Sequence, residues 1–96
     1  MVEENGSELD DVGPDADDIQ PMSFAIFVLS LNASALLHLG DGQDAGSLDL
    51  PLARQTIDIL GMIEEKTRGN LSGEEERLLH QILFDLRMRY ARKVAG

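Results

Sequence analysis

The sequence contains no cysteine and no tryptophan, and its only aromatic residues are three phenylalanines and one tyrosine. Without cysteine, the chain can form neither a disulfide bond nor a thiolate metal site, which fits a reducing cytosol. The shortage of aromatic side chains leaves no platform on which the bases of single-stranded nucleic acid could stack. We therefore predict a cytoplasmic protein, and we do not predict nucleic acid as a partner.

The motifs of common enzyme and metal sites are also missing. The sequence has no phosphate-binding glycine loop, and no serine or threonine lies in a nucleophile motif. His38 and His80 fall in different predicted helices, and the spacing supplies no third metal ligand. The loop that begins at Asp41 half resembles a calcium-binding loop. Its twelfth position, however, is Leu52 and not the required glutamate. We therefore predict no enzymatic activity and no cofactor, and we assign no catalytic, cofactor-binding or metal-binding residue.

Basic residues are absent from the first 20 positions, which carry eight acidic side chains. Most of the formal net charge of −10 therefore belongs to this segment, and the remaining chain is nearly balanced. High net charge with few large apolar residues is typical of disordered segments. We predict a disordered acidic tail over residues 1–21 and a helical domain over residues 22–94.

Residues 23–39 contain no charged side chain and are apolar at most positions. Ser23 is a candidate N-cap and Gly40 a candidate helix stop, and the length of the segment favours a helix over a buried strand. Such a helix spans about 24 Å at roughly 1.5 Å per residue, which is short of a ~30 Å hydrocarbon core. Because so small a chain cannot surround so apolar a helix, we expect this helix to mediate self-association.

The second predicted helix covers residues 50–67 and shows the helical period. Asp49 and Pro51 are typical of a helix start, and Gly69 is suited to the left-handed conformation after its end. Its apolar stripe includes Ala53, Ile57 and Leu60.

The third predicted helix covers residues 73–93, and Ser72 with Glu75 forms a capping-box pattern at its start. Acidic residues lie near its beginning and basic residues near its end, as the helix dipole favours. Its apolar stripe consists of Leu79, Ile82, Leu83, Leu86 and Tyr90. Together the three segments predict an all-α, three-helix hairpin-type bundle in antiparallel or orthogonal packing, completed by homo-oligomerisation.

Two sets of residues are candidates for contacts with other molecules. For the self-interface we select four positions in the first helix: Phe27, Leu31, Ala35 and Leu36. For a protein partner we select four charged positions in the other helices: Arg54, Asp58, Arg87 and Arg89. An alternative function is membrane association, with the apolar helix 24–39 in or on the bilayer and the basic residues 87–93 facing anionic lipid.

Three blocks resemble a family of short bacterial proteins catalogued as domain of unknown function 1844. They are FAIFVLSLNASALLHLG, LARQTIDILGMIEEKTRGNL and EEERLLHQILFDLRMRY, which lie in this order within residues 24–90 and leave out the loop 41–49, and the middle block is the most specific. The resemblance implies a whole bacterial protein, cytosolic, with no established activity, cofactor or substrate. The function that the sequence favours is therefore a non-enzymatic, self-associating helical interaction module.

Overall fold

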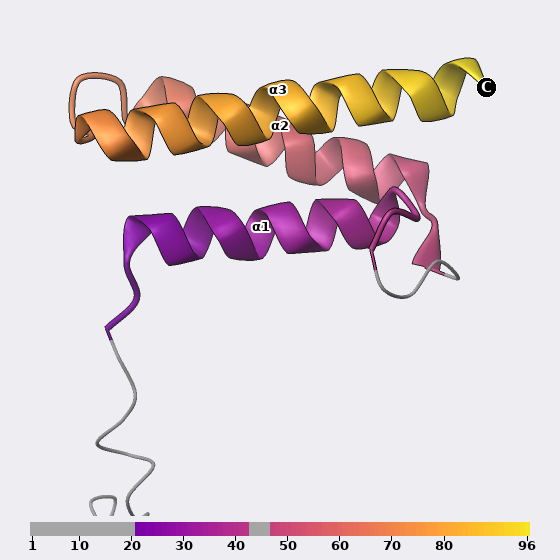
Figure 1. Ribbon diagram of the computed structural model, residues 1–96, viewed down its shortest axis with the longest axis horizontal. Helices are drawn as coiled ribbons and strands as arrows, with labels where there is room; N and C mark the ends of the chain where they lie inside the picture. The colour runs from indigo at the N-terminus through magenta and orange to yellow at the C-terminus, as the bar shows by residue number, and fades with distance from the viewer. Residues whose placement is uncertain (1–20, 43–46) are drawn as a thin grey trace, which may run out of the picture.

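The computed structural model describes residues 21–42 and 47–96, which form three α-helices joined in sequence (Figure 1). Helix α1 spans Phe24–His38, α2 spans Leu50–Lys66 and α3 spans Gly73–Ala95. The described residues contain no β-strand. The all-α prediction is therefore confirmed, whereas the predicted acidic tail lies, apart from Pro21, outside the described residues.

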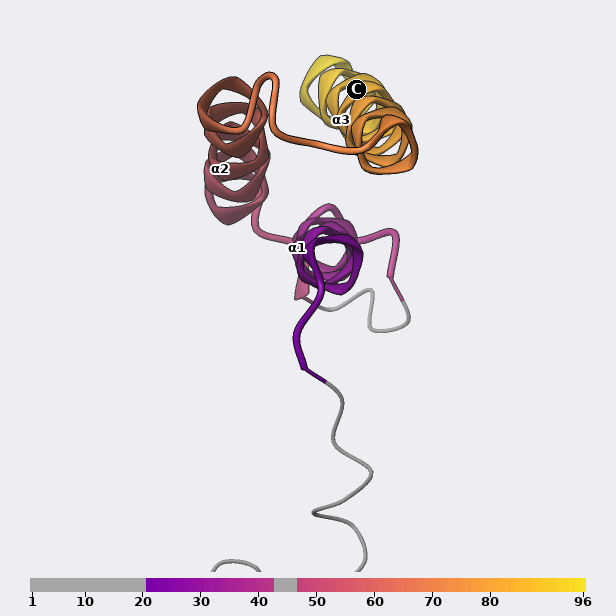
Figure 2. The ribbon, with the colours of Figure 1, turned by 90° about the vertical axis from the view of Figure 1, so that its left-hand side faces the viewer.

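Each helix packs against the other two, and consecutive helices run in opposite directions along the molecule. Figure 2 shows the three helices nearly end-on, at the corners of a triangle. The packing is thus antiparallel, and α1 and α3 run in the same direction. As a result, the C-terminal ends of α1 and α3 lie at the same end of the bundle.

The helix ends are set by local hydrogen bonds that the sequence indicates. The side chains of Ser23 and Asp49 each accept a hydrogen bond of 3.1 Å from the backbone N–H three residues later. Ser72 and Glu75 form both hydrogen bonds of the capping box at the start of α3. Gly69 has a φ of +85° in the turn after α2, a conformation that a residue with a Cβ adopts only at a cost.

The core lies between the three helices and is formed by aliphatic side chains. Helices α2 and α3 contribute the faces that their periodic stripes predict, and α1 contributes fewer residues. The buried apolar residues are Val28, Ala35, Leu39, Ala53, Ile57, Leu60, Leu79, Ile82, Leu83 and Leu86. One face of α1 is therefore inside the bundle, and the opposite face is turned away from α2 and α3.

Candidate interaction surface

The side of α1 that points away from the bundle carries no charged residue. At about 100° per residue, four positions lie opposite the buried Val28 and Ala35, and Leu29 and Ser34 flank them on either side. We call these four positions, together with Leu29 as the exposed one of the two flanks, the outer face of α1: Ile26, Leu29, Ser30, Ala33 and Leu37. Ile26 and Leu29 are each 47% exposed. Since α1 contains no Asp, Glu, Lys or Arg, this outer face is an apolar strip without a charged side chain.

The one polar side chain on the outer face is already hydrogen-bonded. The hydroxyl of Ser30 donates to the carbonyl oxygen of Ile26 at 2.9 Å, within the same helix. Burying a hydroxyl is costly mainly when its hydrogen bond to water is not replaced. Covering the outer face of α1 therefore leaves no unsatisfied side-chain donor at Ser30.

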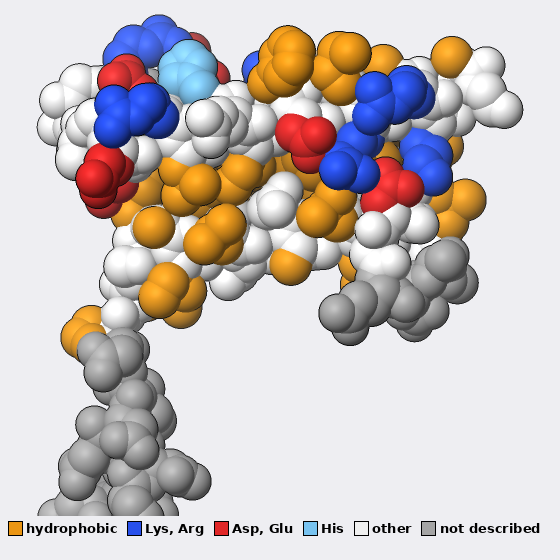
Figure 3. Space-filling view, in the orientation of Figure 1, with side chains coloured by type: hydrophobic (Ala, Val, Ile, Leu, Met, Phe, Trp, Pro, Cys, Tyr) orange, Lys and Arg blue, Asp and Glu red, His pale blue; other side chains and the backbone are white. Residues whose placement is uncertain are grey.

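Other apolar side chains outside the outer face of α1 are also exposed. Met22 just before the helix is 69% exposed, Phe27 on the flank of α1 is 41% exposed, and Leu52 in the first turn of α2 is 43% exposed. Figure 3 shows apolar side chains along α1 and between α1 and α3, while charged side chains gather over α3 and the turn before it. The part of the molecule around α1 is thus the less charged part of this view.

The four residues selected for the self-interface do not share one exposed face. Phe27 is exposed, but Ala35 is fully buried in the core. Leu31 and Leu36 are half-buried and pack against that core. The selection placed Ala35 outside because α1 is apolar on every side, so its sequence gives no signal for which side faces inward. For the same reason the selection did not include the exposed Ile26, Leu29 and Ala33.

The four charged residues selected as partner contacts fall into separate groups. Arg54 and Asp58 pair with each other across 3.8 Å on the surface of α2, and about two thirds of each side chain is exposed (68% and 69%). Arg87 is exposed on α3 and its guanidinium lies next to Gly61 of α2. The structure therefore brings Arg54 and Asp58 together as an ordinary surface pair, without Arg87.

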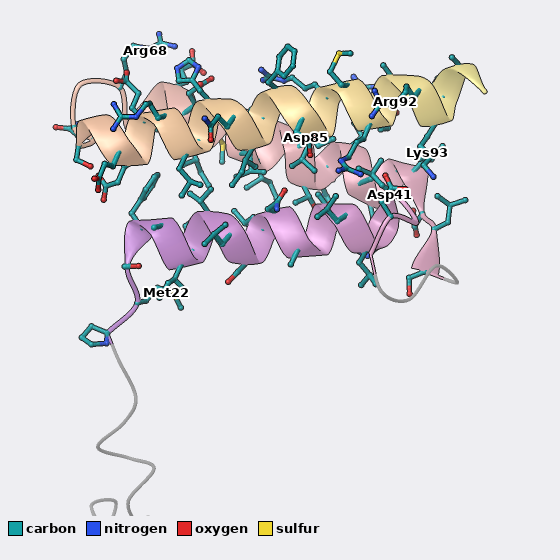
Figure 4. The ribbon with its side chains drawn as sticks, viewed as in Figure 1. Met22, Asp41, Arg68, Asp85, Arg92 and Lys93 are labelled. Carbon is teal, nitrogen blue, oxygen red and sulfur yellow. The ribbon has the colours of Figure 1, made fainter. Side chains whose placement is uncertain are left out.

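Arg89, the fourth selected residue, holds the end of α1 to α3. Its Nε donates to a carboxylate oxygen of Asp85 at 2.8 Å, and its Nη1 donates to Asp41 at 3.2 Å. The ammonium of Lys93 lies 3.0 Å from the other oxygen of Asp41. Figure 4 shows Asp41 just after α1 and facing Lys93. This cluster joins groups 48 positions apart in the sequence, which no local pattern indicates.

The ion pairs of this cluster also shift the pKa values of Asp41 and Arg89. The hydrogen bond from Lys93 lowers the pKa of the Asp41 carboxyl most, and Arg89 lowers it further, although partial desolvation opposes both. Asp85, followed by Asp41, raises the pKa of the Arg89 guanidinium. Arg89 and Lys93 are thus engaged in holding the helices together.

A shallow hollow of about 290 Å³ lies where α2 turns into α3, and its lining includes Glu64, Arg68, Leu71 and His80. His80 Nε2 lies 3.4 Å from a Glu64 oxygen, and more than half of the His80 side chain is exposed. Within residues 21–42 and 47–96, no three His, Asp or Glu side chains are placed to share a metal ion. None of the helices in these two ranges is both long and apolar enough to cross a bilayer.

The comparisons with known proteins add a family but no activity. No match was found among curated proteins or among solved structures. A family model described as "Domain of unknown function (DUF1844)" matches residues 21–92. Because this match covers well over half of the sequence, the chain belongs to that family, and the resemblance noted over residues 24–90 is confirmed.

Proposed function

We propose that this member of the DUF1844 family is a non-enzymatic interaction module that self-associates through the outer face of α1. The observation that supports the proposal is a helix without charged side chains that is covered on one side only. Contiguous exposed apolar surface is uncommon on monomeric proteins and typically marks a contact with another molecule. A second copy of the same face supplies an apolar surface of matching length.

The free energy gained by burying apolar side chains indicates which residues must take part in a dimer interface. Fully burying a leucine or isoleucine contributes about 1.5–3 kcal/mol, so covering the exposed halves of Ile26 and Leu29 in two copies contributes roughly 3–6 kcal/mol. Association costs at least about 4 kcal/mol in lost translational and rotational freedom. The two residues alone thus give at best a weak complex. A stable one also needs the flanking Phe27, Leu52 and Met22.

The arrangement of charge favours a protein partner over the lipid surface of the alternative function. A helix lying on an anionic membrane usually carries Lys or Arg beside its apolar face. Helix α1 has neither, and Arg89 and Lys93 of the basic segment 87–93 are paired with Asp41. Arg92 lies on α3, as Figure 4 shows, and not on α1. The basic side chains and the apolar outer face therefore do not share one plane.

Sedimentation velocity over a range of micromolar concentrations tests the proposal. We expect the wild-type protein to sediment as a defined oligomer and Leu29→Glu to sediment as a monomer, because each dimer would bury two unpaired carboxylates. The matched control is Phe84→Glu, which adds the same charge at a residue of α3 that is 69% exposed. This control should leave the oligomer unchanged, and circular dichroism should report the same helix content for all three proteins.

Two results would contradict the proposal. A wild-type protein that stays monomeric at high micromolar concentration would remove self-association. Loss of the oligomer in Phe84→Glu but not in Leu29→Glu would move the interface to α3. Flotation of the wild-type monomer with anionic liposomes would support membrane association instead.

A further inference from the structure

We propose that a hollow between α2 and α3, beside Arg87, binds a small organic monocarboxylate with an aromatic or branched apolar body. Among the described residues, this hollow is lined by side chains of α2 and α3 and not by α1. The inference is therefore independent of the proposed self-interface. Three features support it: the lining of the hollow, the unpaired guanidinium of Arg87, and a glycine in the facing turn of α2.

The hollow has the size and the mixed lining of a site for a small ligand. Its volume is about 370 Å³, and it is lined by Glu64, His80, Leu83, Phe84, Arg87 and Met88. Leu83 belongs to the core, whereas Phe84 and Met88 are exposed beside it. Small-ligand sites typically measure about 300–1,000 Å³ and combine apolar and aromatic side chains with a few polar groups. The three apolar side chains can therefore hold the apolar body of a ligand.

Arg87 supplies the charge that defines the class of the ligand. Within residues 21–42 and 47–96 its guanidinium forms no ion pair, whereas Arg54 and Arg89 are each paired with aspartate. A guanidinium presents a planar fork of N–H donors that matches the two oxygens of a carboxylate. Phe84 precedes Arg87 by three residues, so the two side chains lie on neighbouring parts of the helix surface. A carboxylate bound at Arg87 thus places its apolar body beside Phe84.

Gly61 leaves the space in which the Arg87 guanidinium lies. Glycine is unfavourable in a helix interior, and Gly61 lies inside α2. A Cβ added at this position would lie 3.1 Å from Nη2 of Arg87. The missing side chain therefore lets the guanidinium approach the backbone of α2, at the edge of the hollow. In this way α2 gives up some helix stability and the hollow gains a cation.

Glu64 and His80 restrict the ligand to a single negative charge. The Glu64 side chain is 23% exposed, and one of its carboxylate oxygens lies 3.4 Å from Nε2 of His80. His80 and Arg87 are seven residues apart on α3, which corresponds to about 10 Å at 1.5 Å per residue. A carboxylate at the Arg87 end is therefore separated from Glu64, whereas a second carboxylate nearer the Glu64 end would be repelled.

Nuclear magnetic resonance titration of the isotopically labelled full chain tests the site with three matched probes. Phenylpropanoate carries one carboxylate, phenylpropanol carries none, and benzylmalonate carries a second carboxylate on the same skeleton. We expect phenylpropanoate to shift the backbone amide signals of Gly61, Phe84 and Arg87 with a Kd of about 1 mM, as suits so small a ligand. Phenylpropanol and benzylmalonate should each bind at least about tenfold more weakly.

Two variants and a matched control assign the binding to Arg87. Arg87→Gln should weaken phenylpropanoate binding about tenfold. The control Arg92→Gln removes the same charge from an exposed residue of α3 that does not line the hollow, and it should leave binding unchanged. Gly61→Ala should weaken binding several-fold without destabilising the protein, because the added Cβ displaces the guanidinium. Circular dichroism of all variants should report the wild-type helix content.

Several results would overturn the proposal. One is the absence of saturable shifts in the wild-type protein at about 10 mM phenylpropanoate. A second is equal binding of phenylpropanol, and a third is equal weakening by Arg87→Gln and Arg92→Gln. Equal binding of benzylmalonate would overturn the restriction to monocarboxylates. Sedimentation velocity of the same samples keeps the two proposals apart, since a monomeric protein that binds phenylpropanoate at Arg87 would overturn only the proposed function.

Discussion

The α2–α3 hairpin and helix α1 bury their apolar residues in different ways. In the hairpin, the buried residues follow the helical period on one face of each helix, and charged residues occupy most of the opposite faces. Exposed apolar residues of the hairpin such as Phe84 have charged neighbours, here Asp85 and Arg87. In α1 the exposed face is as free of charge as the buried one. This difference is the basis of the proposed self-interface on α1.

The largest expected effect separates the core of the hairpin from the outer face of α1. Leu60→Ala should lower the free energy of unfolding by about 2–5 kcal/mol, because Leu60 has no exposed surface and its truncation leaves a cavity. Leu29→Ala should lower it by roughly 1 kcal/mol in dilute, monomeric samples, because about half of Leu29 is already exposed. Urea denaturation followed by circular dichroism measures both. Equal losses would mean that Leu29 is packed inside the bundle.

The turn of the hairpin gives the next largest effect. Gly69→Ala should cost about 1–2 kcal/mol, because Gly69 has a φ of +85° and no atom within 4 Å blocks an added Cβ. The loss is therefore pure backbone strain. Gly73→Ala is the matched control at the start of α3, where φ is not positive, and it should be neutral or slightly stabilising. Thermal unfolding of the two variants gives the difference, and an equally stable Gly69→Ala would rule out strain at this turn.

Replacing a glycine inside α2 should raise the stability of the protein. Gly61→Ala should stabilise the protein by about 0.5–1 kcal/mol, because glycine is unfavourable in a helix interior. An added Cβ would lie 3.1 Å from Nη2 of Arg87, and this flexible side chain can swing away. Urea denaturation measures the change. A net loss would show that the position of Arg87 beside Gly61 is held by other contacts.

The smallest expected effect concerns the link between α1 and the hairpin. Asp41 has a lowered pKa in the folded protein, so its ionised form contributes stability above its ordinary pKa of 3.8, and this contribution is lost as pH falls through the lowered value. The side chains of its partners Arg89 and Lys93 are each slightly more than a third exposed (35% and 38%). Solvent screening therefore limits the contribution to below about 1 kcal/mol.

Asp41→Asn should remove this contribution. The variant should lose stability at neutral pH and show a shallower decrease than wild type on acidification from about pH 5 to pH 3. Urea denaturation at several pH values measures the two profiles. Asp58→Asn removes a carboxylate from an exposed i,i+4 pair in α2 and serves as the control, with little expected change. Identical profiles for Asp41→Asn and wild type would mean that the link contributes no stability.

Local patterns in the sequence predicted much of this structure. Ser23, Asp49 and Ser72 were identified as caps, and each accepts the expected backbone hydrogen bond. The structure extends α3 to Ala95, two residues past the predicted end, and ends α2 at Lys66, one residue before it. The loop 41–49 illustrates the opposite case. Its sequence does not indicate that Asp41 binds side chains of α3.

The sequence by itself determined where the helices begin, where they end to within two residues, and which faces of α2 and α3 turn inward. Caps and apolar periods are properties of residues within a few positions of each other, so they can be read without a partner. Only the tertiary structure decided which side of α1 is buried, because every side of that helix is apolar. It placed Ala35 in the core and Ile26 outside, and it joined Asp41 to Lys93. Those outcomes depend on where α2 and α3 lie in space, which no short stretch of sequence encodes.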